Sequence, residues 1–208
     1  MKTIIKLNNL DAKKFFQESH NYCNLDLPVY FNFSPLLSKV SEYMDNKQFN
    51  SLINSTTKPY ELSDVNYIFL NNKDGKFSWR PFQLIHPAFY IYLSNLICNE
   101  TSWRLLQNRF KEFKNNKNIS CYSLPPVEDF SSNSVSSQNI HRWWKNIEQQ
   151  SIELVLIYDY VLHTDINNCY GSIYTHSIAW AIHGKDEAKK LKNDKNLLGN
   201  LVVFQKVC

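Results

Sequence analysis

A short apolar run that leads to an acidic residue is the feature that most constrains the fold of this chain. Residues 154–161 are mostly aliphatic or aromatic, and Asp165 follows them closely. An apolar run of this length is typical of a strand buried within a sheet. We therefore expect a buried strand that delivers the Asp165 carboxylate at its end, with the ring of Tyr170 just beyond it.

A second pattern predicts a β-hairpin over residues 65–84. Its two halves, residues 65–70 and 77–84, are rich in strand-forming side chains, and Asp74-Gly75 between them is a strong turn signal. Pro81 lies in the second half and has no backbone N–H, so we expect that strand to lie at an edge or to contain a bulge. The sequence therefore predicts one antiparallel pair with Arg80 on the return strand.

Helical periodicity covers much of the remaining chain. Helices are expected from Pro35 onward and over residues 12–17, 88–98, 103–113, 139–153, 172–182 and 185–195. Asp11 would be the N-cap of the helix over residues 12–17. The Ser-rich residues 127–138 show no periodicity and are expected to form an exposed loop. Because helices and strands interleave, the predicted class is α/β or α+β, rich in helix.

Composition excludes several classes of protein. The 208 residues include only 4 Gly, and no glycine-rich phosphate loop is present. The 5 Cys are odd in number and widely spaced, which argues against a zinc site or a disulfide framework. No apolar run approaches the ~20 residues of a membrane span, so we expect a soluble, cytoplasmic protein without a membrane partner. The net charge of +4 permits a polyanionic partner but does not require one.

The segment around Asp165 reads YDYVLHTDINNCYGSIYTHSI from Tyr158 to Ile178. By spacing alone, Asp165 could cap the next helix or turn, and Tyr170 could pack in the core. The segment resembles motif A of reverse transcriptases, most closely those of the bacterial abortive-infection and defence-associated group. The resemblance implies that Asp165 binds catalytic Mg²⁺ (or Mn²⁺) and that Tyr170 lies under the sugar of an incoming dNTP. The backbone carbonyl of Ile166 could add a further metal ligand.

The expected hairpin carries a second resemblance. Its residues NKDGKFSWRPFQLIHP, from Asn72 to Pro87, are similar to the fingers hairpin of the same family. The resemblance implies that Arg80 meets the triphosphate, with Lys73 and Lys76 as weaker candidates. A guanidinium group can hold two phosphate oxygens at once, which an ammonium group cannot. The alternative is an exposed basic hairpin in which Trp79 makes a packing contact.

Two tryptophans lie in a segment that resembles the helix before motif A. This segment covers residues 139–153 and contains Trp143 and Trp144. A ring in such a helix can pack in the core or can serve as a stacking platform for a nucleic-acid base. We expect both tryptophans to be core residues.

The resemblance divides the chain into three parts. Residues 1–64 would be an N-terminal helical extension, residues 65–150 the fingers-like region, and residues 151–208 the first part of the palm. Family members carry adjacent aspartates in a later palm hairpin, and no Asp-Asp pair occurs in these 208 residues. We therefore expect a fragment of an RNA-directed DNA polymerase with an antiphage defence role, inactive by itself.

The expected partners are dNTPs and nucleic acid, either RNA or single-stranded DNA. One alternative is a non-catalytic nucleic-acid-binding or assembly module, or an inactive remnant, which keeps the fingers but lacks the chemistry. Another is a soluble α/β protein in which the match to motif A is accidental. The oligomeric state is not indicated by any pattern in the sequence.

Overall fold

The computed structural model groups the chain into two compact units. One unit comprises Met1–Leu7 with Leu106–Tyr174, and the other comprises Asn8–Leu105 with Thr175–Cys208. The structure describes residues 3–23, 25, 27–28, 30–44, 65–72, 79–122, 124–127, 135–166, 169–174, 176–194 and 198–199. Within these ranges the protein is a helix-rich α+β structure with one two-stranded sheet. The three-part division into extension, fingers and palm stays a prediction.

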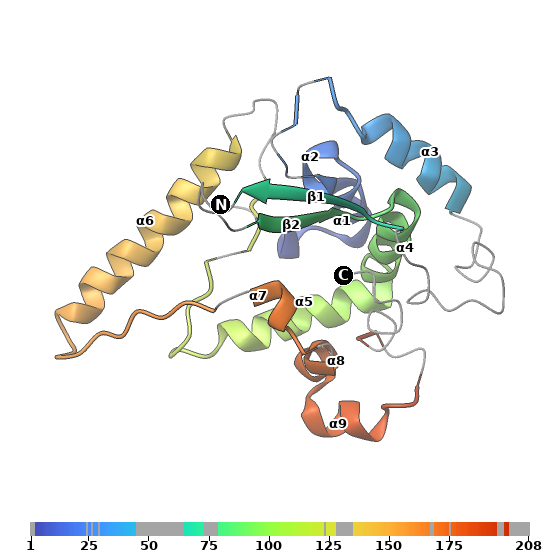
Figure 1. Ribbon diagram of the computed structural model, residues 1–208. Helices are drawn as coiled ribbons and strands as arrows, with labels where there is room; N and C mark the ends of the chain where they lie inside the picture. The colour runs from blue at the N-terminus through green and yellow to red at the C-terminus, as the bar shows by residue number, and fades with distance from the viewer. Residues whose placement is uncertain are drawn as a thin grey trace. The chain divides into compact units, whose positions relative to one another are not determined.

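The larger unit contains the hairpin and most of the helices. Its elements are α1 (Asn9–Phe16), α2 (Ser19–Tyr22), α3 (Ser34–Met44), β1 (Tyr67–Asn72), β2 (Trp79–Leu84), α4 (Pro87–Ile97), α8 (His176–His183) and α9 (Lys185–Lys190) (Figure 1). The first residues of α5 (Glu100–Lys114) also belong to it. The helices expected after Pro35 and over residues 88–98 and 103–113 are therefore confirmed.

The start of α1 differs from the expectation. The N-cap is Asn8, whose side-chain oxygen accepts a hydrogen bond of 2.8 Å from the backbone N–H of Asp11. The Asn8 side-chain amide donates in turn to the Asp11 carboxylate, also at 2.8 Å. The prediction of Asp11 as N-cap was wrong because the helix begins earlier. Asp11 lies instead in the first turn, where a negative charge is favoured by the helix dipole.

The core of this unit lies between α3 and α4, which pack side by side (Figure 1). Its buried centre consists of Leu37 and Met44 from α3 and Ile91 from α4. The partly buried side chains packed around it are Tyr22, Phe33, Val40, Tyr90 and Tyr92. Burying apolar surface of this kind is the main favourable contribution to folding.

The predicted hairpin is confirmed. β1 and β2 pair antiparallel, with Tyr67 opposite Leu84 and Asn72 opposite Trp79. Pro81 lies opposite Leu70. Each strand of a two-stranded sheet has one unpaired edge, so the missing N–H of a proline is tolerated there.

The smaller unit contains the N-terminal residues and a long helix. Its elements are η1 (Ile4–Lys6), most of α5, α6 (Val135–Val155) and α7 (Cys169–Ser172). The backbone N–H of Ile4 donates to the carbonyl of Pro125 at 3.0 Å. The side chain of Gln107 donates to the carbonyls of Ile5 and Leu7, at 2.8 and 2.9 Å. These hydrogen bonds hold the N-terminal residues against α5.

The buried strand expected over residues 154–161 was wrong. Leu154 and Val155 are the last residues of α6, and the chain from there to Ile166 is irregular and exposed. Leu156, for example, keeps 82% of its side-chain surface accessible. A strand needs a neighbouring backbone to satisfy its N–H and C=O groups. In the described ranges the sheet contains β1 and β2 alone, so residues 154–161 have no strand partner there.

Two further boundaries were misplaced. α6 begins at Val135, so the expected loop over residues 127–138 is too long, although residues 128–134 lie outside the described ranges. The expected helix over residues 172–182 is divided between α7 and α8. In the described part of the chain, no helix combines the length and apolar character needed to cross a membrane.

Candidate functional site

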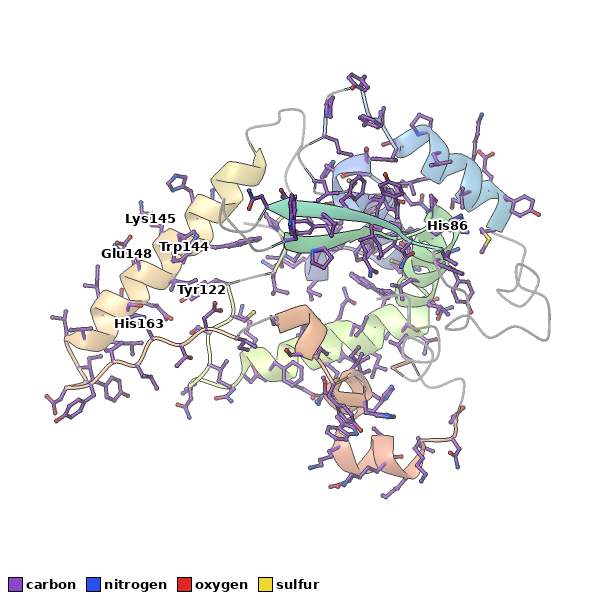
Figure 2. All side chains as sticks on the ribbon, in the orientation of Figure 1. His86, Tyr122, Trp144, Lys145, Glu148 and His163 are labelled. Carbon is purple, nitrogen blue, oxygen red and sulfur yellow. The ribbon has the colours of Figure 1, made fainter. Side chains whose placement is uncertain are left out.

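Asp165 lies in the smaller unit, in irregular backbone after α6. Its side chain is exposed, and one carboxylate oxygen accepts a hydrogen bond of 2.8 Å from the backbone N–H of Ile166. Ile166 is exposed as well, and so is His163 two residues earlier (Figure 2). The carboxylate is therefore accessible to solvent and to a ligand, but it is not presented from the end of a strand.

The oxygen ligands near Asp165 are of the kind that suits a hard divalent cation. Mg²⁺ prefers carboxylates, carbonyls and water in a near-octahedral arrangement, and it is often bound through one or two carboxylates and substrate phosphates. No three His, Cys, Asp or Glu side chains within the described ranges come together as a metal-binding group. Asp165 and the carbonyl of Ile166 would thus supply only part of a coordination shell.

The other predicted site residues are placed only in part. Tyr170 belongs to α7 in the smaller unit, and Arg80 belongs to β2 in the larger unit, opposite Asn71. The side chains of both lie outside the described residues. Lys73 and Lys76 lie between the two strands in the sequence and are also outside the described ranges. The phosphate-binding role of these three basic residues stays a prediction.

Trp144 on α6 was misjudged from the sequence. Its side chain is 68% exposed, whereas that of Trp143 is only partly accessible. Successive residues of an α-helix point about 100° apart, because the helix has about 3.6 residues per turn. Two adjacent tryptophans therefore face different directions. The expectation that both lie in the core was wrong for Trp144.

The exposed side of α6 carries charge around this ring. His141 and Glu148 lie three residues before and four after Trp144, and Lys145 lies four residues after His141. At about 100° per residue, the four positions fall within an arc of about 100° on the helix. All four side chains are exposed, and Figure 2 labels three of them along the helix. We call these four residues the Trp144 face. The helical spacing of 141, 144, 145 and 148 was the signal that could have identified it.

Buried titratable groups lie in the larger unit and have a structural role. Burial raises the pKa of Tyr22 to about 12, and nearby Cys23 adds to this effect. Burial likewise raises the pKa of the Cys98 thiol to about 12, against a smaller opposing effect of Lys13. The pKa of Tyr90 is raised mainly by burial. These groups are held protonated at neutral pH, so they are poor nucleophiles and poor bases there.

Comparison of the chain with models of known protein families gives no match, and comparison with curated protein sequences gives none.

Proposed function

We propose that this chain contains the fingers and the first part of the palm of an RNA-directed DNA polymerase of the reverse-transcriptase type, with a role in antiphage defence. The observation that carries the proposal is the exposed Asp165 carboxylate within the segment that resembles motif A, followed by Tyr170 in α7. The antiparallel hairpin formed by β1 and β2 adds support, since the resemblance implies a hairpin at this place.

The resemblance implies a separate role toward a dNTP for each residue. Asp165 and the carbonyl of Ile166 would hold a divalent cation, which neutralises charge on the triphosphate and helps to activate the attacking hydroxyl. The ring of Tyr170 would lie against the sugar and exclude a 2′-hydroxyl. The guanidinium group of Arg80 would hold phosphate oxygens in a bidentate manner. Lys73 and Lys76 would add positive charge on the same hairpin.

We expect the chain by itself to bind dNTP without polymerising it. The sequence contains no adjacent aspartates, and two cations are needed to stabilise both the attacking and the leaving oxygen of the transfer. One carboxylate with a backbone carbonyl does not hold two cations. Incorporation of labelled nucleotide by the purified chain, abolished by Asp165→Ala, would contradict this expectation.

Binding of a labelled dNTP in equilibrium dialysis, with and without Mn²⁺, tests the proposal. We expect binding to require Mn²⁺ and to be lost in Asp165→Asn, which removes the charge and keeps the shape of the side chain. Asp159→Asn is the matched control, because Asp159 is an exposed aspartate in the same irregular segment. Equal binding by wild type and Asp165→Asn, or no binding by wild type, would rule the proposal out.

The second candidate function is a non-catalytic nucleic-acid-binding module. The Trp144 face favours it, because an exposed aromatic ring beside basic side chains is typical of surfaces that bind single strands. In that case the chain would bind nucleic acid, and Asp165→Asn would change neither nucleotide nor nucleic-acid binding.

A further inference from the structure

We propose that the Trp144 face of α6 binds single-stranded nucleic acid, with the indole ring of Trp144 stacking on a base. The inference deepens the second candidate function, because it names the surface and the kind of strand that binds there. It is independent of the proposed polymerase function, because it uses no residue of the motif-A segment and requires no catalysis. Its test can therefore fail while the dNTP test succeeds, and the reverse.

Trp144 is exposed on the surface of α6. A tryptophan is among the side chains that gain most from burial, so a tryptophan residue that is 68% exposed is an unusual arrangement in a folded helix. The ring lies on the middle of a 21-residue helix rather than at a fraying end. The position of the ring is thus held by regular backbone, which suits a fixed stacking platform.

The charged residues nearest the ring in the sequence are basic. Lys145 and His141 share the face with Trp144, and Arg142 lies one residue from His141. From Phe130 to Ile147 the sequence contains no Asp or Glu. Positive charge beside an exposed ring complements a phosphate backbone whose bases are available for stacking.

The proposed binding surface ends at Glu148. Glu148 lies one helical turn beyond Trp144 on the same face, and Glu153 follows further along α6. Carboxylates repel phosphates, so Glu148 marks the limit of the binding surface toward the C-terminal half of the helix. A single strand would therefore lie over His141, Trp144 and Lys145.

The strand is expected to be single because stacking on a side chain requires an unpaired base. Sequence preference should be weak, since every base has a face that can stack. A protein partner is the competing occupant, because exposed tryptophans also occur in protein interfaces. The basic half of α6 favours nucleic acid over that partner.

The experiment measures binding of fluorescein-labelled oligo(dT) and oligo(U) to the full 208-residue chain by fluorescence anisotropy at several salt concentrations. We expect Trp144→Ala to weaken binding roughly tenfold, in line with the usual contribution of one stacked base. Trp144→Phe keeps an aromatic face and should retain most of the affinity. Far-UV circular dichroism checks that the variants are folded, which is expected for an exposed position.

The charged neighbours give independent readouts. Lys145→Gln should lower the dependence of log K on log salt by about 0.7, the value for one lost phosphate contact to a single strand. Glu148→Gln should strengthen binding, which a purely structural role of Glu148 would not produce. Two substitutions with opposite effects on the same face thus test the charge argument.

Three outcomes would overturn the inference. The first is wild-type affinity in Trp144→Ala. The second is absence of oligonucleotide binding by the wild-type chain at low salt. The third is a change of oligomeric state in Trp144→Ala, seen by light scattering, without a change in oligonucleotide binding. That last result would assign the face to contact between protein molecules.

Discussion

The phenol oxygen of Tyr90 donates a hydrogen bond of 2.7 Å to the backbone carbonyl of Phe16, 74 residues away in the sequence. The ring of Tyr90 also contacts that of Tyr22 edge to face, with 4.9 Å between the centroids. Tyr22 in turn donates to the backbone carbonyl of Ile85 at 2.5 Å. Two phenols thus join the N-terminal helices to the residues on either side of the start of α4.

Removing the hydroxyl of Tyr90 should destabilise the protein. In Tyr90→Phe the carbonyl of Phe16 loses its partner in a part-buried place, and a net loss of about 1 kcal/mol is expected. Urea unfolding followed by circular dichroism gives the free energy of unfolding. Tyr30→Phe is the control, since Tyr30 is exposed and should change stability by less than about 0.5 kcal/mol. Equal effects of the two substitutions would contradict the role of this hydrogen bond.

Stability should fall in alkaline solution. The pKa of Tyr22 is raised from 10.0 to about 12, and that of Cys98 from 9.0 to about 12. At a pH between the ordinary and the raised pKa of each group, the group loses its proton in the unfolded chain but keeps it in the folded chain. The free energy of unfolding therefore decreases as pH rises. The contribution is complete below pH 9 and is lost as pH approaches about 12.

Urea unfolding at a series of pH values above neutrality measures this decrease. Tyr22→Phe cannot ionise at that position, so its stability should fall less steeply with pH than that of the wild type. A stability that stays constant or rises over this range would show that burial does not hold these groups protonated.

Two neighbouring leucines of α3 should respond differently to truncation. Leu37 is fully buried at 0% exposure, whereas Leu36 is 45% exposed. Leu37→Ala leaves a cavity between α3 and α4 and should cost about 2–5 kcal/mol. Leu36→Ala should cost well under half of that. Thermal unfolding of both variants makes the comparison, and a larger effect at Leu36 would mean that the opposite side of α3 is the buried one.

Two glycines should both resist replacement by alanine, for different reasons. A Cβ atom on Gly199 would lie 2.5 Å from the Cα atom and 2.8 Å from the backbone nitrogen of Ala179 in α8. Backbone atoms cannot rotate away, so Gly199→Ala should cost about 1–3 kcal/mol. Gly184 has a φ of +84° but open space around it. Gly184→Ala should cost about 1–3 kcal/mol from the backbone conformation alone, because a positive φ with a ψ of 149° is nearly confined to glycine.

The midpoint of thermal unfolding compares the two glycine variants directly. A wild-type midpoint in Gly199→Ala would show that Gly199 does not approach α8 as closely as described, and a wild-type midpoint in Gly184→Ala would show that the positive φ is not required.

Local signals predicted the hairpin and most of the helices because short-range interactions decide them. Asp74-Gly75 is a strong turn signal in the sequence, Pro35 and Pro87 favour the first turn of a helix, and apolar periodicity marks α4 and α5. The N-cap of α1 was misplaced from Asn8 to Asp11, a difference of less than one turn. Both residues are good caps, so the sequence alone does not choose between them.

The residues around the candidate site depended on more distant parts of the chain. An apolar run such as residues 154–161 can form a strand only where another strand pairs with it, and in the described ranges α6 ends within this run instead. Asp165 is consequently exposed in irregular backbone. Which of Trp143 and Trp144 is exposed depends on how α6 packs. The sequence shows only that the two tryptophans are adjacent, and it does not show which of them faces solvent.

The sequence by itself determined where most of the described helices and the antiparallel pair of β1 and β2 lie, since these follow from the conformational preferences of a few neighbouring residues. Only the tertiary structure decided that the apolar run before Asp165 is exposed and that Trp144 faces outward. Burial and strand pairing are properties of surfaces that meet in space, and they depend on residues far away in the chain.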